Sequence, residues 1–162
     1  MQADSVSNRS VIELFDYEFG SLLESLRKLT GSVPAELLYR RPPSITIGEN
    51  ILKSAGVVEQ TFGGLTANLW DDPFEWTLPE ALSTPDRILG YLKEVEGTRL
   101  SAFRSFNNDD GALLKLIAVP SGVPCTLLEL LLSTLSRASD YRGRATATLK
   151  ILSDVSAPGF II

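Results

Sequence analysis

The chain has 162 residues, of which 44% are hydrophobic and 22% are charged, and this length and balance predict one domain over residues 1–162. Twenty acidic residues against 15 Lys and Arg give a net charge of −5, and no basic cluster is longer than Arg40-Arg41, so we do not expect nucleic-acid binding. The sequence contains no histidine, which excludes a histidine-ligated metal and a Ser-His-Asp catalytic triad.

The single cysteine, Cys125, cannot form a disulfide within the chain and suits a reducing compartment. The first ten residues are polar and lack the apolar core of a signal peptide. No segment approaches the run of about 18 apolar residues that a membrane-spanning helix needs. We therefore expect a soluble, cytoplasmic protein with no membrane partner.

The segment from Ser10 to Leu29 carries the first helical pattern. Ser10 and Glu13 form a capping box, in which each side chain accepts a hydrogen bond from the other residue's backbone N–H. Thr30-Gly31 provides a stop signal. Apolar residues recur at spacings of three and four, which places them on one face: Ile12, Phe15, Phe19, Leu22, Leu26 and Leu29.

A second helix is predicted to begin at Thr46, with Glu49 as its capping-box partner. It follows a connection in which Pro34 could begin one helical turn. The pattern fades into a loop at residues 70–73, and Gly63-Gly64 is expected to loosen the last turns. The apolar face comprises Ile47, Ile51, Ala55, Val58, Phe62, Leu65 and Leu69.

A third helix is predicted to begin at Thr84, with Pro85 at its first position, and to end at residues 107–111. Its apolar face comprises Ile88, Leu92, Val95, Ala102 and Phe106. Leu114, Leu116 and Ala118 form a weak alternation of apolar residues, and Pro120-Ser121-Gly122 is typical of a turn. Together they favour an ordered loop that can include a short strand.

The fourth helix is predicted to begin at Thr126, with Glu129 completing a third capping box. The apolar end at residues 157–162 contains Pro158-Gly159 and is expected to pack in an extended form. The main face comprises Leu127, Leu131, Leu135, Ala138, Ala145 and Leu149, and it is widened by Leu128 and Leu132. Four such segments can close around one core, so the predicted fold is an all-α four-helix bundle with long connections, at least one of which crosses over.

Several short motifs occur in an order that resembles one known family. Arg41-Pro42-Pro43 precedes Thr46-Ile47-Gly48 at the start of the second helix. A Pro-Ser-Gly loop leads through Val123-Pro124-Cys125-Thr126 into the leucine-rich last helix, which carries Tyr141-Arg142-Gly143-Arg144. This order resembles the DinB-like, or YfiT-like, superfamily over nearly the whole chain.

The resemblance implies a four-helix bundle that is commonly a dimer, and in many members a divalent metal held by three histidines. Some members are transferases or isomerases that use low-molecular-weight thiols. Counted from the same motifs, the three histidine positions fall here on Lys53, Arg137 and Tyr141. Two cations repel a divalent metal, and a protonated tyrosine is a poor replacement for imidazole. We therefore expect neither the family metal nor another cofactor.

Lys53, Arg137 and Tyr141 are accordingly the candidate cleft residues. Arg137 and Tyr141 are one helical turn apart, so they could line a pocket for an anionic or polar small molecule. The alternative is a partly exposed arginine and a tyrosine packed at the edge of the core. Lys53 lies almost opposite the apolar stripe of its helix and could be a solvated lysine. A one-residue difference in register would place Ser54 at the family position instead.

Three other features have a structural interpretation beside a functional one. Cys125 precedes a helix start, which can activate a thiol, but a small apolar loop residue is the alternative. Asp71-Asp72 and Asp109-Asp110 could serve acid–base or calcium chemistry, although solvated loop ends are the simpler interpretation. Trp70 and Trp76 could line a pocket mouth or cover the open end of the bundle.

Two functional hypotheses follow from these patterns. The first is a non-catalytic, small-ligand-binding or stress-associated homodimer that has lost the family metal site. The second is a metal-independent, thiol-dependent transferase-like enzyme that uses the former metal cleft. The lack of a plausible base or nucleophile favours the first. A homodimer is expected because six leucines crowd into residues 127–135, more than one helix face can bury.

Overall fold

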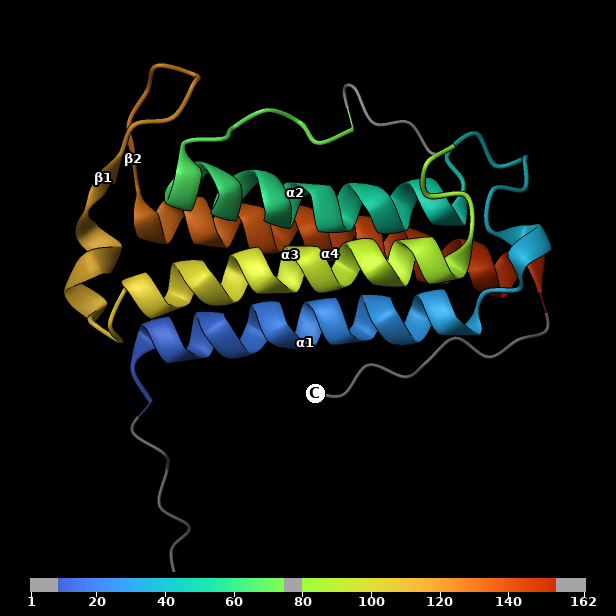
Figure 1. The fold of residues 1–162 in the computed structure, drawn as a ribbon, viewed down its shortest axis with the longest axis horizontal. Helices are drawn as coiled ribbons and strands as arrows, with labels where there is room; N and C mark the ends of the chain where they lie inside the picture. Colours follow the sequence, from blue (N-terminus) through green and yellow to red (C-terminus); the bar gives the residue numbers. More distant parts are fainter. Residues whose placement is uncertain (1–8, 75–79, 154–162) are drawn as a thin grey trace, which may run out of the picture.

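The computed structural model describes residues 9–74 and 80–153, and it confirms the predicted all-α four-helix bundle (Figure 1). The expected extended end at residues 157–162 and Trp76 lie outside the described residues. The elements are α1 (Val11–Ser32), the 3₁₀ turn η1 (Ala35–Leu37), α2 (Ile47–Ala67), α3 (Pro85–Ser105), the 3₁₀ turn η2 (Asp110–Leu114), the strands β1 (Leu116–Ile117) and β2 (Cys125–Thr126), and α4 (Leu127–Leu152).

The helix order contains the crossover that the long connections predict. α1 and α4 run in one direction and α2 and α3 run in the other, as the colour gradient in Figure 1 shows. α2 packs mainly against α4 and α3, whereas α1 packs mainly against α3 and α4. Because α2 and α3 run in the same direction, the connection between them at residues 68–84 has to return along the length of the bundle.

The four helix starts lie where the capping signals predict them. Complete capping boxes are formed by Ser10 with Glu13, by Thr46 with Glu49 and by Thr126 with Glu129. α3 begins at Pro85, and its N-cap Thr84 accepts a hydrogen bond from the backbone N–H of Arg87. These local signals satisfy backbone donors that the first helical turn leaves without a partner.

The core is built from the predicted apolar faces. All six predicted positions of α1 are buried, and so are the first five of α2. At one end of the bundle three phenylalanine rings meet: the centroid of Phe19 lies 5.0 Å from that of Phe62, and the centroid of Phe103 lies 5.4 Å from that of Phe62. Such tilted and edge-to-face pairs join α1, α2 and α3 around one contact.

Of the predicted apolar positions, Leu69 and Leu132 are exposed, and Leu65, Phe106, Leu128 and Leu135 are only half-buried against the core. Leu69 is 62% exposed because α2 ends at Ala67 and Asn68 takes a left-handed conformation that turns the chain away. In α4 the fully buried position is Thr134 rather than Leu135, which is half-buried. The Thr134 hydroxyl lies 2.7 Å from that of Thr61, so this polar pair is satisfied inside the α2–α4 contact.

Arg99 occupies a core position that the sequence pattern leaves open between Val95 and Ala102. Its side chain is 5% exposed, and its guanidinium forms ion pairs with Glu96 on the same helix and with Asp16 on α1. Burial favours the neutral form, but the two carboxylates outweigh that effect and raise the pKa of Arg99. The ion cluster therefore joins α3 to α1 at a buried position that the predicted apolar face did not include.

The described part of the α2–α3 connection lies along α2, where its side chains pack against two glycines of the helix. A Cβ at Gly64 would lie 2.3 Å from the Trp70 ring, and a Cβ at Gly56 would lie 2.7 Å from the Phe74 ring. α2 continues through Gly63-Gly64 to Ala67, and the missing side chain of Gly64 admits an indole ring.

The acidic loop pair at residues 109 and 110 has a structural role. The Asp110 carboxylate accepts hydrogen bonds from the backbone N–H groups of Val11 and Ile12, at 3.1 and 3.0 Å, and so caps the start of α1. Asp109 caps η2 by accepting from the Gly111 backbone at 2.9 Å. Asp110 thus fastens the α3–α4 connection to the start of α1.

The α3–α4 connection also contains the short strand that its alternation allowed. β1 pairs antiparallel with β2, with Leu116 opposite Thr126 and Ile117 opposite Cys125. The backbone N–H of Leu127 donates to the carbonyl of Lys115 at 2.9 Å, which joins the hairpin directly to the first turn of α4. The hairpin loop is thereby held beside the start of α4.

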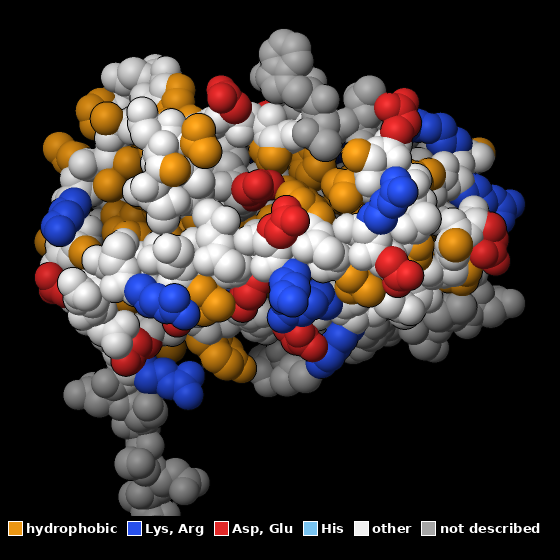
Figure 2. Space-filling view, in the orientation of Figure 1, with side chains coloured by type: hydrophobic (Ala, Val, Ile, Leu, Met, Phe, Trp, Pro, Cys, Tyr) orange, Lys and Arg blue, Asp and Glu red, His pale blue; other side chains and the backbone are white. Residues whose placement is uncertain are grey.

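The surface carries charges of both signs without a large patch of one sign on the face that Figure 2 shows. Within residues 9–74 and 80–153, no helix combines the length and apolar character required to cross a membrane.

Candidate functional site

Lys53, Arg137 and Tyr141 line the same cavity, on the outer side of the contact between α2 and α4. This cavity, which we call the charged cavity, has a volume of about 260 Å³. Its lining residues come from α2, from α4 and from the loop after α2: Lys53, Gly56, Val57, Gln60, Asp72, Phe74, Arg137 and Tyr141. The three positions that the family resemblance selects are therefore brought together by two helices distant in the sequence.

The geometry assigns Lys53, rather than Ser54, to the charged cavity. The Nζ atom of Lys53 lies 5.8 Å from the centre of the Tyr141 ring, within the range of a cation–π contact. Ser54 is fully buried, and its hydroxyl donates to the backbone carbonyl of Ala138 at 2.7 Å. Ser54 therefore joins the two helices and does not line the cavity.

The charges around the charged cavity do not cancel. Lys53 and Arg137 contribute two positive charges and Asp72 contributes one negative charge. Neither cation forms an ion pair within the part of the chain that the structure describes. Arg144 lies near the Tyr141 ring, with its Cζ atom 5.6 Å from the ring centre, but its guanidinium is paired with the Asp140 carboxylate at 2.7 Å and adds no uncompensated charge. The cavity therefore carries an excess of positive charge in a protein whose net charge is −5.

The loop after α2 covers one side of the charged cavity. The backbone N–H of Phe74 donates to the Asp72 carboxylate at 2.9 Å, which fixes a tight turn. The Phe74 ring rests against Gly56, and Pro73 lies beside it. Asp72, expected as a solvated loop end, is thus exposed yet shapes the loop that covers the cavity.

A second cavity adjoins the charged cavity along α4. We call it the apolar cavity; its volume is about 500 Å³. Gln60 and Arg137 line both cavities, so the two meet at these side chains. The remaining lining residues of the apolar cavity are Thr61, Trp70, Val119, Pro120, Ser121, Cys125, Glu129, Leu130, Ser133 and Thr134.

Cys125 and Trp70 are both placed in this second cavity. Cys125 is half-buried in β2, with a free thiol. Trp70 is held by three contacts: its ring rests against Gly64, its backbone carbonyl accepts a hydrogen bond from the Gln60 amide at 2.7 Å, and its indole N–H donates to the Asn68 side-chain carbonyl at 2.9 Å. The sequence placed Trp70 at a possible pocket mouth, and the structure shows it as one wall of the apolar cavity.

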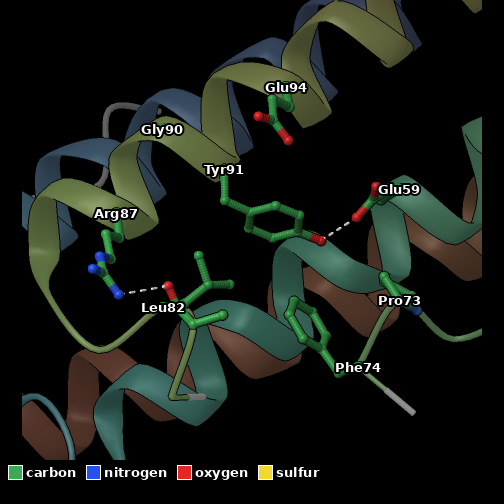
Figure 3. Close-up of a pocket in the computed structure, with 9 residues that line it drawn as sticks. Glu59, Pro73, Phe74, Leu82, Arg87, Gly90, Tyr91 and Glu94 are labelled. Atoms are coloured by element: carbon green, nitrogen blue, oxygen red, sulfur yellow. Dashed lines mark hydrogen bonds between the residues drawn. The ribbon is translucent and has the colours of Figure 1, made fainter. Parts of the chain in front are cut away.

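A third cavity, of about 520 Å³, lies between α2 and α3 (Figure 3). The Tyr91 hydroxyl on α3 donates to the Glu59 carboxylate on α2, and Glu94 lies on the same side. Burial, and then the neighbouring Glu59, raise the pKa of Tyr91 far above its usual range. The sequence analysis missed this pair because no local motif connects two residues that are 32 positions apart.

Metal ligands do not gather at any of these places. Over residues 9–74 and 80–153, no group of three or more His, Cys, Asp or Glu side chains is arranged to hold a metal ion. In the charged cavity, Lys53 and Arg137 stand at positions where the family resemblance expects ligands, and a cation there opposes a divalent metal.

No protein-family model matches this sequence, and no curated protein matches it. Membership of the DinB-like superfamily therefore stays a prediction. It is based on the order of the short motifs along the chain.

Proposed function

We propose that this protein is a DinB-like small-ligand-binding protein whose metal site has been replaced by a binding site for an organic anion. The observation that carries the proposal is the convergence of Lys53, Arg137 and Tyr141 on one cavity that has an excess of positive charge. We further propose that the protein is non-catalytic, stress-associated and cytoplasmic, and that it forms a homodimer.

The chemistry of the three side chains favours an anion. A guanidinium offers a fork of N–H donors that matches the two oxygens of a carboxylate, and an ammonium adds a compact positive charge. The Tyr141 hydroxyl can donate a further hydrogen bond. Lys53 and Arg137 are exposed, so their side chains can turn toward an anion without a large rearrangement.

Binding is favoured over catalysis because the charged cavity holds no group suited to be a general base at neutral pH beyond the exposed Asp72. A metal-independent, thiol-dependent transferase is the alternative. Its specific support is that Cys125 lines the adjoining cavity, where a thiol could meet a ligand held at Arg137. Turnover of a thiol substrate that is abolished by Arg137→Gln would favour this alternative.

Isothermal calorimetry with benzoate tests the anion site, with benzamide as the neutral ligand of the same shape. Benzoate should bind the unchanged protein and benzamide should bind at least tenfold more weakly, because only the former carries a charge for the two cations to pair with. The double variant Lys53→Gln/Arg137→Gln should lose benzoate binding.

The matched control is the double variant Lys93→Gln/Arg104→Gln. It removes two exposed cations from α3 that line none of the described cavities, so it changes the net charge equally. Benzoate binding should survive in this control. Equal binding of benzoate and benzamide, or equal losses in both double variants, would contradict a specific anion site.

A further inference from the structure

The charged cavity and the apolar cavity are neighbours along α4 and share two lining side chains, and we treat the pair as one elongated groove. Leu130, Ser133, Thr134, Arg137 and Tyr141 recur on α4 at spacings of three and four, so they lie along one face of the helix. At 1.5 Å per residue, this face extends over about 16 Å. Gln60 and Arg137 stand at the junction of the two cavities.

Polarity changes sharply along this groove. One end holds Lys53, Arg137 and Tyr141, and the other end is bounded largely by apolar groups from Trp70, Pro120 and Leu130. The hydroxyls of Thr61 and Thr134, which face the apolar cavity, lie 2.7 Å apart, and that of Thr134 also lies 2.8 Å from the Leu130 carbonyl. These two hydroxyls are thus already paired and make little demand on a ligand, whereas Ser121, Glu129 and Ser133 add further polar groups to the rim of the same end.

Contacts within the chain hold two walls of the groove. Trp70 is held by Gly64 and Gln60, and the hairpin that carries Pro120 is tied to α4 through the Lys115 carbonyl. A preformed apolar site binds a flexible chain without first having to order its own loops.

From this arrangement we infer that the ligand is a monocarboxylate with an extended apolar tail, its carboxylate at Lys53 and Arg137 and its tail between Trp70 and Leu130. The inference rests on the proposed anion site and names the class of ligand. A single negative charge fits better than a phosphate monoester, because Asp72 offsets one of the two cations that line the charged cavity.

Calorimetry with butanoate, hexanoate, octanoate and decanoate tests the tail. Each added methylene that enters the apolar cavity should tighten Kd about fourfold, the change that corresponds to about 0.8 kcal/mol. The gain should stop once the cavity is filled. Octyl phosphate should bind more weakly than octanoate, and tighter binding of the phosphate would overturn the assignment of a carboxylate.

A blocking variant makes the location of the tail testable. Ser133 is exposed and lines the apolar cavity, so Ser133→Trp should fill that space without disturbing the core. This variant should bind butanoate normally and lose the gain with chain length. Ser136→Trp, on an exposed position of the same helix that lines neither cavity, should keep the gain.

The single cysteine reports on the same end of the groove. Octanoate, but not butanoate, should slow alkylation of Cys125 by iodoacetamide, because only the longer tail reaches the apolar cavity. Butanoate binding that depends on Arg137, with no gain from longer chains and no protection of Cys125, would overturn the tail while leaving the anion site. Failure of every carboxylate to bind would overturn both.

Discussion

The Nζ atom of Lys53 lies 5.8 Å from the centre of the Tyr141 ring, which connects α2 to α4 across the outer side of their contact. The Cζ atom of Arg144 lies 5.6 Å from the centre of the same ring. An aromatic face attracts cations, so the Tyr141 ring helps to position Lys53 beside the cavity. Arg144 is paired with the Asp140 carboxylate at 2.7 Å, whereas Lys53 forms no ion pair within residues 9–74 and 80–153 and stays able to bind an anion.

The unchanged protein should bind no metal at the charged cavity, and three histidines placed there should create a metal site. The unchanged protein, mixed with nickel, zinc or manganese and then desalted, should retain well below one equivalent of metal, because Lys53 and Arg137 repel a divalent ion. The triple variant Lys53→His/Arg137→His/Tyr141→His should retain about one equivalent, because three imidazoles then meet in one cavity.

The same experiment also checks whether Lys53 or Ser54 occupies the site position on α2. A triple variant that carries Ser54→His in place of Lys53→His should not gain metal, since Ser54 is buried against the Ala138 carbonyl. Stoichiometric metal in the unchanged protein, lost on changing Arg137 or Tyr141, would contradict the replacement of the metal site.

Gly64→Ala should destabilise the fold by about 2 kcal/mol, because the new methyl group would lie 2.3 Å from the Trp70 ring and force the loop away. Urea unfolding monitored by circular dichroism measures the change. The matched control is Gly97→Ala in α3, where a Cβ meets nothing within 4 Å. That variant should gain about 1 kcal/mol from its higher helix propensity. A loss of equal size at both glycines would show that Trp70 does not rest on Gly64.

The capping box of α2 should make stability depend on pH. Partial burial of Glu49 favours the neutral acid, but hydrogen bonds from Thr46 and the charge of Arg41 outweigh it and hold the pKa of Glu49 below 4.5. A carboxyl group whose folded-state pKa is lowered stabilises the fold above its unfolded pKa, and this contribution is lost as pH falls through the folded value.

Glu49→Gln isolates that contribution, because glutamine keeps the shape of the capping box and removes the charge. The unchanged protein should be more stable than the variant at pH 7, by roughly 1 kcal/mol, and the difference should shrink as pH falls through the lowered pKa of Glu49. Denaturant midpoints measured between pH 3 and pH 7 check this. A difference that is constant over the range would contradict the pKa shift.

A homodimer remains a prediction, and α4 supplies the residue with which to test it. Leu132 is 53% exposed, whereas Leu128 and Leu135 are half-buried against the core. Light scattering at micromolar concentration should report about twice the chain mass of 17.6 kDa. Leu132→Glu should shift the protein toward the monomer, and Leu69→Glu, which adds the same charge at an exposed leucine outside α4, should not. A monomer at high concentration would contradict the prediction.

The helix starts were predictable because their signals are local. A capping residue and its partner, such as Ser10 and Glu13, lie three positions apart and act within one turn. The helix ends were less predictable. Only the left-handed conformation of Asn68 in the structure shows that Leu69 leaves the core. Relationships between distant residues, such as the pairing of Arg99 with Asp16, carry no local signal at all.

The candidate site was predictable only in part, and for the same reason. The resemblance selected Lys53, Arg137 and Tyr141 one by one, but their meeting depends on α2 and α4 running in opposite directions, which an apolar stripe does not encode. The apolar cavity was not foreseen, because it needs the Trp70 loop and the hairpin to close over α4 from two separate connections.

An amide-resolved NMR titration with benzoate tests the anion site most directly, because it locates the ligand. Saturable shifts should be confined to the amides around Lys53, Arg137 and Tyr141, and those around Glu59 and Tyr91 in the cavity between α2 and α3 should stay in place. Benzoate shifts centred on Tyr91, or shifts that persist unchanged in Lys53→Gln/Arg137→Gln, would contradict an anion site between α2 and α4.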